Sequence, residues 1–414
     1  MSEIVANANP QSGLARTTTG PLDRAARAGV HRALRSLEHG MLRVSDPLGK
    51  VEFGRPAADG LCGAVEVEDP RFYRSVALGG ALGAGDAFVE GRWSSPDLVS
   101  VTRLFARNLP AARAFDSPLS KASRVLQTVL HRLRKNTPSG SRKNIQQHYD
   151  LSNEFFAEFL DPTMTYSCGL FDDESETMQQ ATERKFERIC RLAEIDSSDH
   201  VVEVGCGWGS FARHAAVTRG CRVTGITISQ EQLRYGQPKV QRAGLADQVD
   251  LQFRDYRDMT GVFDKLVSIE MVEAVGRQYL GTFFAKCSEL LKSKGRMALQ
   301  CITIPDARYE SYSRGVDFIQ KYIFPGGCLP SLGAIDEAVS RDGQLEIVEQ
   351  RDFAEDYART LMCWRERFLA AKDRIRGMGF SEEFLRAWDY YLCYCAGGFY
   401  ERQIGLSQIL LAKR

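Results

Sequence analysis

The stretch VVEVGCGWGSF, residues 201–211, decides the fold class. Four strand-forming positions run into a turn with glycines at 205, 207 and 209. Glycine adopts backbone conformations that are closed to other residues, and it lets a ligand approach the main chain closely. The stretch therefore predicts a buried strand followed by a loop that holds a ligand, with a purely structural turn as the alternative.

Two common phosphate-binding loops do not fit this stretch. A P-loop needs a lysine that is absent here, and the dinucleotide fingerprint G-x-G-x-x-G needs glycine where Ser210 stands. That fingerprint also needs an acidic residue about 20 positions later, but the next predicted strand ends in TGITIS. The observed spacing, G-x-G-x-G after the acidic Glu203, is typical of S-adenosylmethionine-dependent methyltransferases.

The loop belongs to an alternation of strands and helices. The predicted strands are 200–205, 221–228, 249–253, 264–270 and 295–304. This order predicts an α/β fold with a doubly wound, Rossmann-like parallel sheet. Ser229 and Gln232 have the spacing of a capping box for the helix after the second strand.

Cofactor candidates follow the strands, because doubly wound sheets bind ligands at the carboxyl ends of their strands. Thr227 and Gln232 come at or just after the second strand, within reach of a ribose and a carboxylate. Asp255, Tyr256 and Arg257 follow the third, where an adenine can lie against an aromatic ring. The loop contributes Glu203, Gly205, Cys206, Gly207 and Gly209.

The composition excludes several classes of protein. A net charge of +1 over 414 residues gives no field that would recruit nucleic acid. The 11 cysteines contain no C-x-x-C pair, which argues against a disulfide framework or a zinc site and fits a reducing cytosol. No apolar run reaches the roughly 18 residues of a membrane span, and the N-terminus has no signal-peptide pattern. We expect a cytoplasmic protein without a metal site.

Changes in composition divide the chain. Residues 1–24 are predicted to be a disordered tail and 25–118 a small α+β module. Residues 117–149 contain no acidic residue, and 119–144 are a basic amphipathic linker. Its helix either docks on anionic lipid headgroups or packs on its own protein. The catalytic domain is expected at 145–414.

Six motifs resemble the cyclopropane fatty acid synthase family, which includes the mycolic acid cyclopropane synthases. They are QQHYDLSNEFFAEFLDPTMTYSCGLF (146–171), VGCGWG (204–209), GITISQEQ (225–232), EMVEAVG (270–276), YIFPGGCLPS (322–331) and CYCAGGF (393–399). The resemblance spans about residues 30–414 and implies that 25–118 is a lipid-binding domain. It also implies S-adenosylmethionine as cofactor, an unsaturated phospholipid as substrate, peripheral contact with the inner face of the membrane, and a homodimer.

The resemblance also implies roles for individual residues. Its cofactor contacts fall on Tyr166, Ser167, Gly205, Gly207, Thr227, Gln232, Tyr256 and Arg257. The family binds bicarbonate, whose ligands here would be Cys168, Glu273, the backbone of Ile302, and Tyr357. A cysteine discussed as an active-site residue corresponds to Cys395.

Gln300 departs from the bacterial relatives, which carry histidine at this position, and agrees with the plant-like branch. Glutamine can donate a hydrogen bond to bicarbonate but cannot take up a proton. We therefore expect bicarbonate, anchored by Glu273, Gln300 and Tyr357, to be the general base. Because two anions repel, one of these partners should carry a proton.

The leading hypothesis is methyl transfer to the double bond of a phospholipid acyl chain, with closure of a cyclopropane ring. A second enzyme reading gives a methylene- or methyl-branched fatty acid through the same cation. A lipid- and cofactor-binding protein without catalysis and a small-molecule methyltransferase are further alternatives. In a small-molecule methyltransferase, the N-terminal module and the basic segment would have no purpose.

Overall fold

The computed structural model describes residues 20–109 and 151–414. The chain divides into two compact units. The first contains the described part of Met1–Leu133 with Arg314–Ile323 and Trp364–Gln403, and the second contains the described part of Arg134–Ser313 with Phe324–Cys363 and Ile404–Arg414. The predicted basic linker, 119–144, lies outside the described residues. Helix α2 begins at Pro21, inside the segment predicted as a disordered tail.

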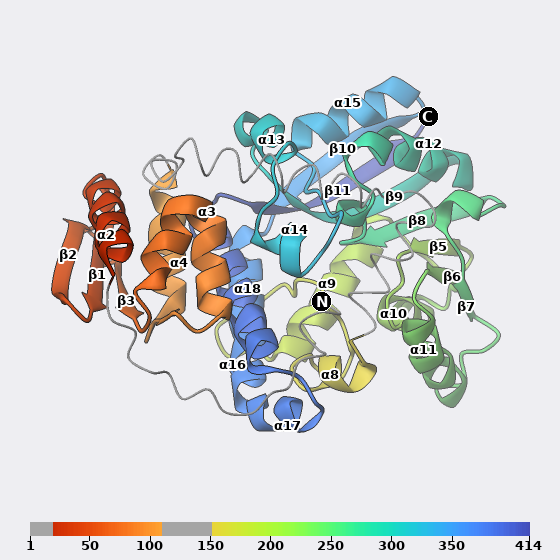
Figure 1. Cartoon of the computed structure of the whole chain (residues 1–414). Helices are drawn as coiled ribbons and strands as arrows, with labels where there is room; N and C mark the ends of the chain where they lie inside the picture. The colour runs from red at the N-terminus through yellow and green to blue at the C-terminus, as the bar shows by residue number, and fades with distance from the viewer. Residues whose placement is uncertain (1–19, 110–150) are drawn as a thin grey trace. The chain divides into compact units, whose positions relative to one another are not determined.

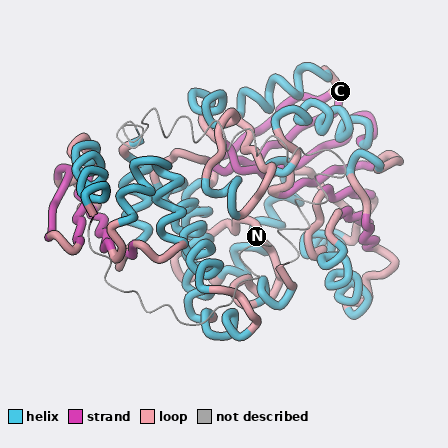
Figure 2. The backbone as a smooth tube through the Cα atoms, viewed as in Figure 1, coloured by secondary structure: helices cyan, strands magenta, loops and turns pink. Residues whose placement is uncertain are grey.

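The first unit contains a four-stranded sheet in the order β2-β1-β3-β4. Its strands are β1(Gly40–Asp46), β2(Gly49–Arg55), β3(Cys62–Val67) and β4(Trp93–Ser94). Its helices are α2(Pro21–Leu34), α3(Arg71–Val89), α4(Leu98–Arg107), α14(Phe318–Tyr322), α17(Lys372–Gly377) and α18(Glu382–Tyr400). Figures 1 and 2 show the helices α3 and α4 beside this sheet. The unit combines helices and strands, as the sequence predicts for residues 25–118, but it also takes in three helices from later in the chain.

Helix α18 corrects the predicted domain boundary, because it belongs to the first unit although it lies late in the chain. It packs along α4. Thr102 Oγ1 donates to the carbonyl of Cys393 at 2.8 Å, and Arg107 Nε donates to Glu401 at 2.7 Å. A Cβ built on Gly397 would lie 2.6 Å from Thr102 Oγ1, so only glycine allows this close approach. A linear reading of composition cannot detect such a long-range pairing.

Helix α14 also joins the first unit. Asp86 on α3 accepts hydrogen bonds from Lys321 Nζ and from Tyr322 OH, each at 2.8 Å. The Phe318 ring lies 4.6 Å from the Tyr390 ring, measured between centroids. The predicted catalytic domain, 145–414, is therefore not one continuous unit.

The second unit is built on a seven-stranded sheet in the order β10-β11-β9-β8-β5-β6-β7. Its strands are β5(His200–Val204), β6(Arg222–Thr227), β7(Val249–Phe253), β8(Phe263–Ile269), β9(Leu291–Thr303), β10(Leu345–Asp352) and β11(Gly405–Lys413). Its helices are α8(Asn153–Ala157), α9(Met178–Leu192), α10(Ser210–Arg219), α11(Gln230–Arg242), α12(Leu280–Leu290), α13(Asp306–Tyr312) and α15(Leu332–Asp342). Short 3-10 helices are η1(Tyr256–Asp258), η2(Val272–Ala274) and η3(Arg277–Tyr279). Helix α16(Ala354–Ala370) contains the boundary between the units, after Cys363.

The five strands from β5 to β9 pair in parallel, as the sequence predicts for a doubly wound sheet. Strands β10 and β11 add an antiparallel edge that the sequence analysis did not predict. The β11 segment QILLA is nearly continuous in apolar residues, because both of its faces are covered. Its pairing with β9 places Gln408 opposite Gln300, which matters for the site.

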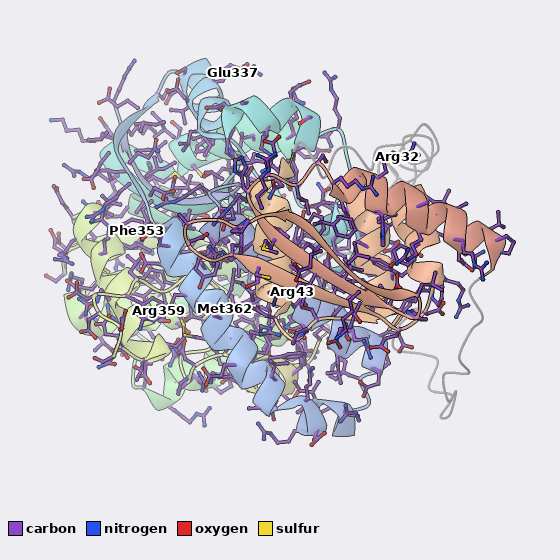
Figure 3. All side chains as sticks on the ribbon, turned by 90° about the vertical axis from the view of Figure 1, so that its left-hand side faces the viewer. Arg32, Arg43, Glu337, Phe353, Arg359 and Met362 are labelled. Atoms are coloured by element: carbon purple, nitrogen blue, oxygen red, sulfur yellow. The ribbon has the colours of Figure 1, made fainter. Side chains whose placement is uncertain are left out.

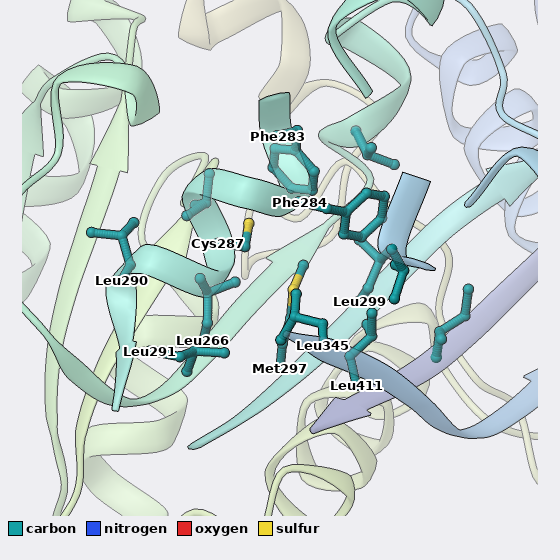
Figure 4. Close-up of a cluster of buried hydrophobic side chains, with 14 of the residues drawn as sticks. Leu266, Phe283, Phe284, Cys287, Leu290, Leu291, Met297, Leu299, Leu345 and Leu411 are labelled. Atoms are coloured by element: carbon teal, nitrogen blue, oxygen red, sulfur yellow. The ribbon is translucent and has the colours of Figure 1, made fainter. Parts of the chain in front are cut away.

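Side chains of successive strand residues pack into two separate cores, one on each face of the sheet. Val202, Leu266 and Met297 belong to the core under α12 and α15, drawn in part in Figure 4. Their neighbours Val201 and Val267 belong to the core under α9, α10 and α11. This alternation is the two-residue period of a strand with both faces buried.

Charged side chains such as Arg43 on β1 and Glu337 on α15 are solvent-exposed (Figure 3). Within the two described ranges, we find no helix whose length and apolar character would let it cross a membrane.

Leu266 tests the core under α12, since its side chain is fully buried. We expect Leu266→Ala to lower the free energy of unfolding by about 2–5 kcal/mol, because it leaves a cavity in a packed core. Urea unfolding of the purified chain measures this loss. Val262→Ala, at a position that is 58% exposed, is the matched control and should change little. Equal effects of the two variants would contradict the assignment of this core.

Candidate active site

The carboxyl ends of the parallel strands assemble the candidate site. Strand β5 ends at the glycine loop, β6 at Thr227, and β7 just before Asp255. Strand β8 ends just before Glu270, and β9 runs through Ile302. The sheet brings these positions to one edge, where doubly wound folds bind their ligands.

The glycine loop has a backbone that requires glycine. Gly205, Gly207 and Gly209 have φ angles of 85°, 53° and 77°. A Cβ on Gly205 would lie 2.6 Å from Met271 Cγ, and one on Gly209 would lie 2.7 Å from Leu251 Cδ1. The Gly205 amide donates to the carbonyl of Ile226 at 3.0 Å, as does the amide of Cys206. The loop is thus fixed against β6, and at Gly207 a Cβ would meet no heavy atom of the described residues within 4 Å.

Glu203, at the end of β5, supplies a buried acid next to this loop. Its side chain is buried, and within the described ranges its Oε2 has no hydrogen-bond partner. Burial raises the pKa of Glu203 well above the usual value for a carboxyl group. A buried oxygen without a partner fits a ligand that brings N–H or O–H donors. S-adenosylmethionine has both, in its ammonium group and its ribose hydroxyls.

Thr227 and Gln232 form a buried pair after β6. Thr227 Oγ1 donates to Gln232 Oε1 at 2.7 Å. Ser229 caps α11 by accepting from the Gln232 amide at 3.3 Å, as predicted. The reciprocal half of the predicted capping box is wrong, because the Gln232 side chain bonds to Thr227 instead. This contact turns the Gln232 amide toward the end of β6, where we expect the cofactor.

The residues after β7 form a second polar turn. Asp255 accepts from the Arg257 backbone amide at 3.0 Å and pairs with the Arg257 guanidinium at 2.7 Å. The Tyr256 ring lies 5.5 Å from the Phe283 ring in an edge-on arrangement, measured between centroids. Asp255 therefore positions Arg257, and Tyr256 offers a half-buried aromatic face beside the loop.

An aromatic cluster connects Tyr166 with the glycine loop. The Tyr166 ring is 5.3 Å from that of Phe156, which is 5.3 Å from that of Trp208 in the loop. The Phe324 ring lies 6.4 Å from that of Tyr166, measured between centroids. These rings place apolar surface next to the loop residue Trp208.

Lys185 is a functional candidate that the sequence analysis missed. Its ammonium group is fully buried and donates to Ser167 Oγ at 2.6 Å. Burial lowers the pKa of Lys185 to about 8. The signal was available, because Lys185 shares the apolar face of α9 with Ala181 and Ile189, where lysine is rare unless it is paired.

Glu270 is the second residue that the sequence analysis missed, and it organises the site. Its Oε1 accepts from the Cys168 backbone amide at 2.9 Å and from Gln300 Nε2 at 2.8 Å. Its Oε2 accepts from Tyr357 OH. The sequence analysis counted Glu270 as the last residue of a strand, whereas its φ of 50° ends β8 and redirects the side chain.

Buried amides fix the orientation of Gln300. Gln408 Nε2 donates to Gln300 Oε1 at 2.8 Å, and Arg188 Nε donates to Gln408 Oε1 at 2.8 Å. Both glutamines are buried. Because its oxygen is already engaged, Gln300 presents its NH₂ group to Glu270. Gln300 is thus a hydrogen-bond donor in the site, and its acceptor in the structure is the Glu270 carboxylate rather than bicarbonate.

Glu273 lies one turn further along the chain. Its Oε1 accepts from the Ile302 backbone amide at 2.5 Å, and its Oε2 is buried without a partner among the residues described. Burial and the neighbouring charge of Glu270 raise the pKa of Glu273 to about 8. Burial raises the pKa of Glu270 as well, while the charge of Lys185 and the three hydrogen-bond donors oppose this rise. We expect Glu273 to be the member of the pair that holds a proton near neutral pH, because its pKa lies at about 8.

Cys168 contributes its backbone to the site. Its side chain is fully buried, Thr360 Oγ1 donates to its sulfur at 3.7 Å, and burial raises the pKa of the Cys168 thiol well above its usual value. A neutral thiol of this kind is inert. Cys395 belongs to the first unit, whereas Cys168, Glu270 and Glu273 belong to the second. Burial raises the pKa of the Cys395 thiol as well.

The predicted bicarbonate site does not fit the residues present. Three of its expected ligand groups, on Cys168, Gln300 and Tyr357, already bind Glu270. The fourth, the Ile302 amide, already binds Glu273. A free anion would have to displace a carboxylate from each group, next to a second acid. Cys168, Gln300 and Tyr357 thus come together around Glu270, while the last two expected ligands, Ile302 and Glu273, bond to each other.

The fold and the cofactor edge define the class of protein. A doubly wound sheet with this glycine loop and polar groups after its next two strands is the architecture of an S-adenosylmethionine-dependent methyltransferase. A family model described as mycolic acid cyclopropane synthetase matches residues 136–409. The chain belongs to this family and is an S-adenosylmethionine-dependent methyltransferase.

Two relatives show how far the similarity extends. The chain is 35% identical over 413 residues to tuberculostearic acid methyltransferase UfaA1 of Mycobacterium tuberculosis, covering 97% of this chain and 94% of the relative. It is also 35% identical over 354 residues to cyclopropane-fatty-acyl-phospholipid synthase of Escherichia coli, covering 84% and 87%. Mycolic acid cyclopropane synthase CmaA1, solved with SAH and CTAB, has a TM-score of 0.62 at 30% identity, covering 66% of this chain and 98% of that one.

Gly205 offers a test of the cofactor loop. In Gly205→Ala the new Cβ would meet Met271, and φ of 85° is unfavourable for alanine. The strain of alanine in this conformation costs about 1–2 kcal/mol and should displace the loop. Binding of S-adenosylhomocysteine should therefore weaken about tenfold. Titration calorimetry measures this affinity. The matched control is Gly244→Ala, at φ 69° in open space, which should leave it unchanged. Equal affinities of the two variants would argue against this loop as the cofactor site.

Glu273 predicts a dependence of stability on pH. Its pKa is about 8 in the folded state against 4.5 for the unperturbed group, so the folded state holds a proton that the unfolded state has lost. The free energy of unfolding should therefore fall as pH rises between these values, by up to about 1.4 kcal/mol per pH unit. Glu273→Gln should reduce this slope, and Glu337→Gln, at an exposed position on α15, should keep it. Urea unfolding at several pH values measures this slope. An unchanged slope in Glu273→Gln would show that the carboxyl group of Glu273 is not protonated in the folded state.

Proposed function

We propose that this chain transfers the methyl group of S-adenosylmethionine to the cis double bond of an unsaturated phospholipid acyl chain and closes a cyclopropane ring. The observation that carries the proposal is the carboxyl group of Glu270 at the cofactor edge of the sheet, on which three hydrogen-bond donors converge. The similarity to the E. coli phospholipid synthase over 84% of this chain supports the substrate class.

The reaction asks three things of the protein. Bound S-adenosylmethionine supplies an electrophilic methyl on its sulfonium, and an isolated alkene is a weak nucleophile, so the two must be held together. The transfer leaves a cation on the acyl chain, which water would quench. The rings of Tyr166, Phe156 and Phe324 favour exclusion of water. A base must then remove one proton, and the site offers the carboxyl group of Glu270 for this purpose.

A second product class is supported by the full-length similarity to UfaA1, a tuberculostearic acid methyltransferase by name. In that reading the cation loses its proton at another carbon after a hydride shift, and the product is a methylene- or methyl-branched fatty acid. The cofactor, the cation and the need for a base stay the same. With either product the substrate lies in a bilayer, so we include peripheral contact with the membrane in the proposal.

Isotope labelling separates the outcomes. The purified chain is incubated with liposomes of monounsaturated phospholipid and S-adenosylmethionine that carries a fully deuterated methyl. Mass spectrometry and proton and deuterium NMR then analyse the released fatty acids. Ring closure removes one deuteron, so we expect two retained deuterons and upfield ring signals.

Two retained deuterons with olefinic signals would instead show a methylene product, and three a methyl-branched alkene. Absence of any mass gain, with S-adenosylhomocysteine still bound in calorimetry, would overturn the proposal and favour a binding protein. A small-molecule substrate would give the same blank result with liposomes, and turnover of cofactor with water-soluble acceptors would reveal it.

A further inference from the structure

We infer that the side chain of Glu270 is itself the general base of the reaction, so that the chain needs no bicarbonate. The inference rests on the proposed function, since it concerns the proton that the cation must lose. It departs from the family resemblance, which places a bound anion among the groups of Cys168, Gln300 and Tyr357.

Hydrogen-bond donors that could hold a bound anion are already used by Glu270. The Cys168 amide, Gln300 Nε2 and Tyr357 OH converge on one carboxylate. Gln300 cannot turn away without breaking its bond to Gln408. Cys168, Gln300 and Tyr357 are buried, whereas Glu270 keeps part of its surface exposed. The three donors thus fix the carboxylate, while Glu270 as a residue is only partly buried.

The second argument is a count of acceptor positions. A carboxylate has about four lone-pair positions, two on each oxygen. Oε1 accepts two hydrogen bonds, from Cys168 and Gln300, while the bond from Tyr357 uses one position on Oε2. The described residues therefore leave about one position on Oε2. With one free lone-pair position, a base can take up a proton while its three hydrogen bonds stay in place.

The third argument is the backbone. Glu270 has φ of 50°, a left-handed conformation in which a residue with a Cβ is strained and glycine is not. Such strain persists where the surrounding structure imposes it, and it is concentrated at functional sites. A glycine would make the same turn at lower energy and leave a space among the three donors. The chain keeps a carboxylate there instead.

Charge also bears on the role of Glu270. Burial raises its pKa, whereas the buried ammonium of Lys185 and the three hydrogen-bond donors favour its ionised form. Glu273, whose pKa is raised to about 8, is neutral at pH 7 and adds no second negative charge beside it. Glu273 bonds to Ile302 rather than to these donors, so we assign it to positioning and charge balance.

The proton transfer balances as follows. Methyl transfer to one alkene carbon breaks the sulfur–carbon bond, whose electron pair stays on sulfur, and leaves a cation on the other alkene carbon. A C–H bond of the new methyl then breaks, and its electron pair forms the third ring bond to the cationic carbon. The proton goes to Oε2 of Glu270, which becomes a neutral carboxylic acid. Solvent takes this proton before the next turnover.

The test uses the full chain in buffer freed of carbon dioxide, with and without added bicarbonate. Wild type should have the same rate in both. Glu270→Gln should lose about 10²–10⁴-fold in kcat, the usual contribution of a general base. Glu270→Gly should be equally slow without bicarbonate, and bicarbonate or formate should restore part of its rate by entering the vacated space.

Binding provides a readout independent of turnover. The NMR signal of ¹³C-labelled bicarbonate should be unaffected by wild type and broadened or shifted by Glu270→Gly. Glu194→Gln and Glu194→Gly are matched controls, since Glu194 is exposed, has φ of 53° and lies outside the site. They should behave as wild type. Calorimetry with S-adenosylhomocysteine confirms that each variant is folded.

The outcomes separate the two proposals. A wild-type rate that depends on bicarbonate, or a Glu270→Gln variant that stays fully active, would overturn the role of Glu270 and leave the proposed function intact. A wild type that alkylates no phospholipid under either condition would overturn the proposed function instead. Bicarbonate binding to wild type would also contradict the inference.

Discussion

The meeting of Glu270 with three donors is the interaction on which the site depends. The donors come from the segment before α9, from β9 and from α16, so one carboxylate ties together parts of the chain about 190 residues apart. Each donor has its own support. Gln300 is oriented by Gln408 on the antiparallel strand β11, which explains why an edge strand outside the parallel sheet matters to the chemistry. Without the carboxylate, these buried donors would lack a partner, which buried polar groups rarely do.

The parallel sheet and the cofactor edge could be predicted from sequence because both depend on local patterns. Strands β5 to β9 are apolar runs bounded by turns, and the spacing of the glycines in the loop is typical of few classes of ligand. Thr227 and Tyr256 followed from their places at strand ends. The family motifs then assigned Cys168, Gln300 and Tyr357, which the structure does bring together.

The remaining features depend on contacts between distant residues. Helix α18 joins the first unit through Thr102 and Glu401, a pairing that no local pattern marks. Glu270 could not be distinguished from a strand residue, because its left-handed φ becomes evident only when β8 is placed beside β9. Lys185 was the exception, since a lysine on the apolar face of a helix is visible in the sequence alone. Its partner Ser167 was predicted, but for a cofactor.

The nature of the base bears on the choice between ring and branch. Both products share one cation, so the carbon that loses its proton decides between them. A bound ion could move within its site. A carboxylate that three donors hold at a fixed residue can accept a proton from one position only. A protein-borne base therefore ties the product to the placement of the acyl chain relative to Oε2 of Glu270. If the new methyl lies nearest, the ring closes; if a chain carbon does, an alkene forms. Selectivity in this chain is then a matter of substrate position and not of the chemistry of the base.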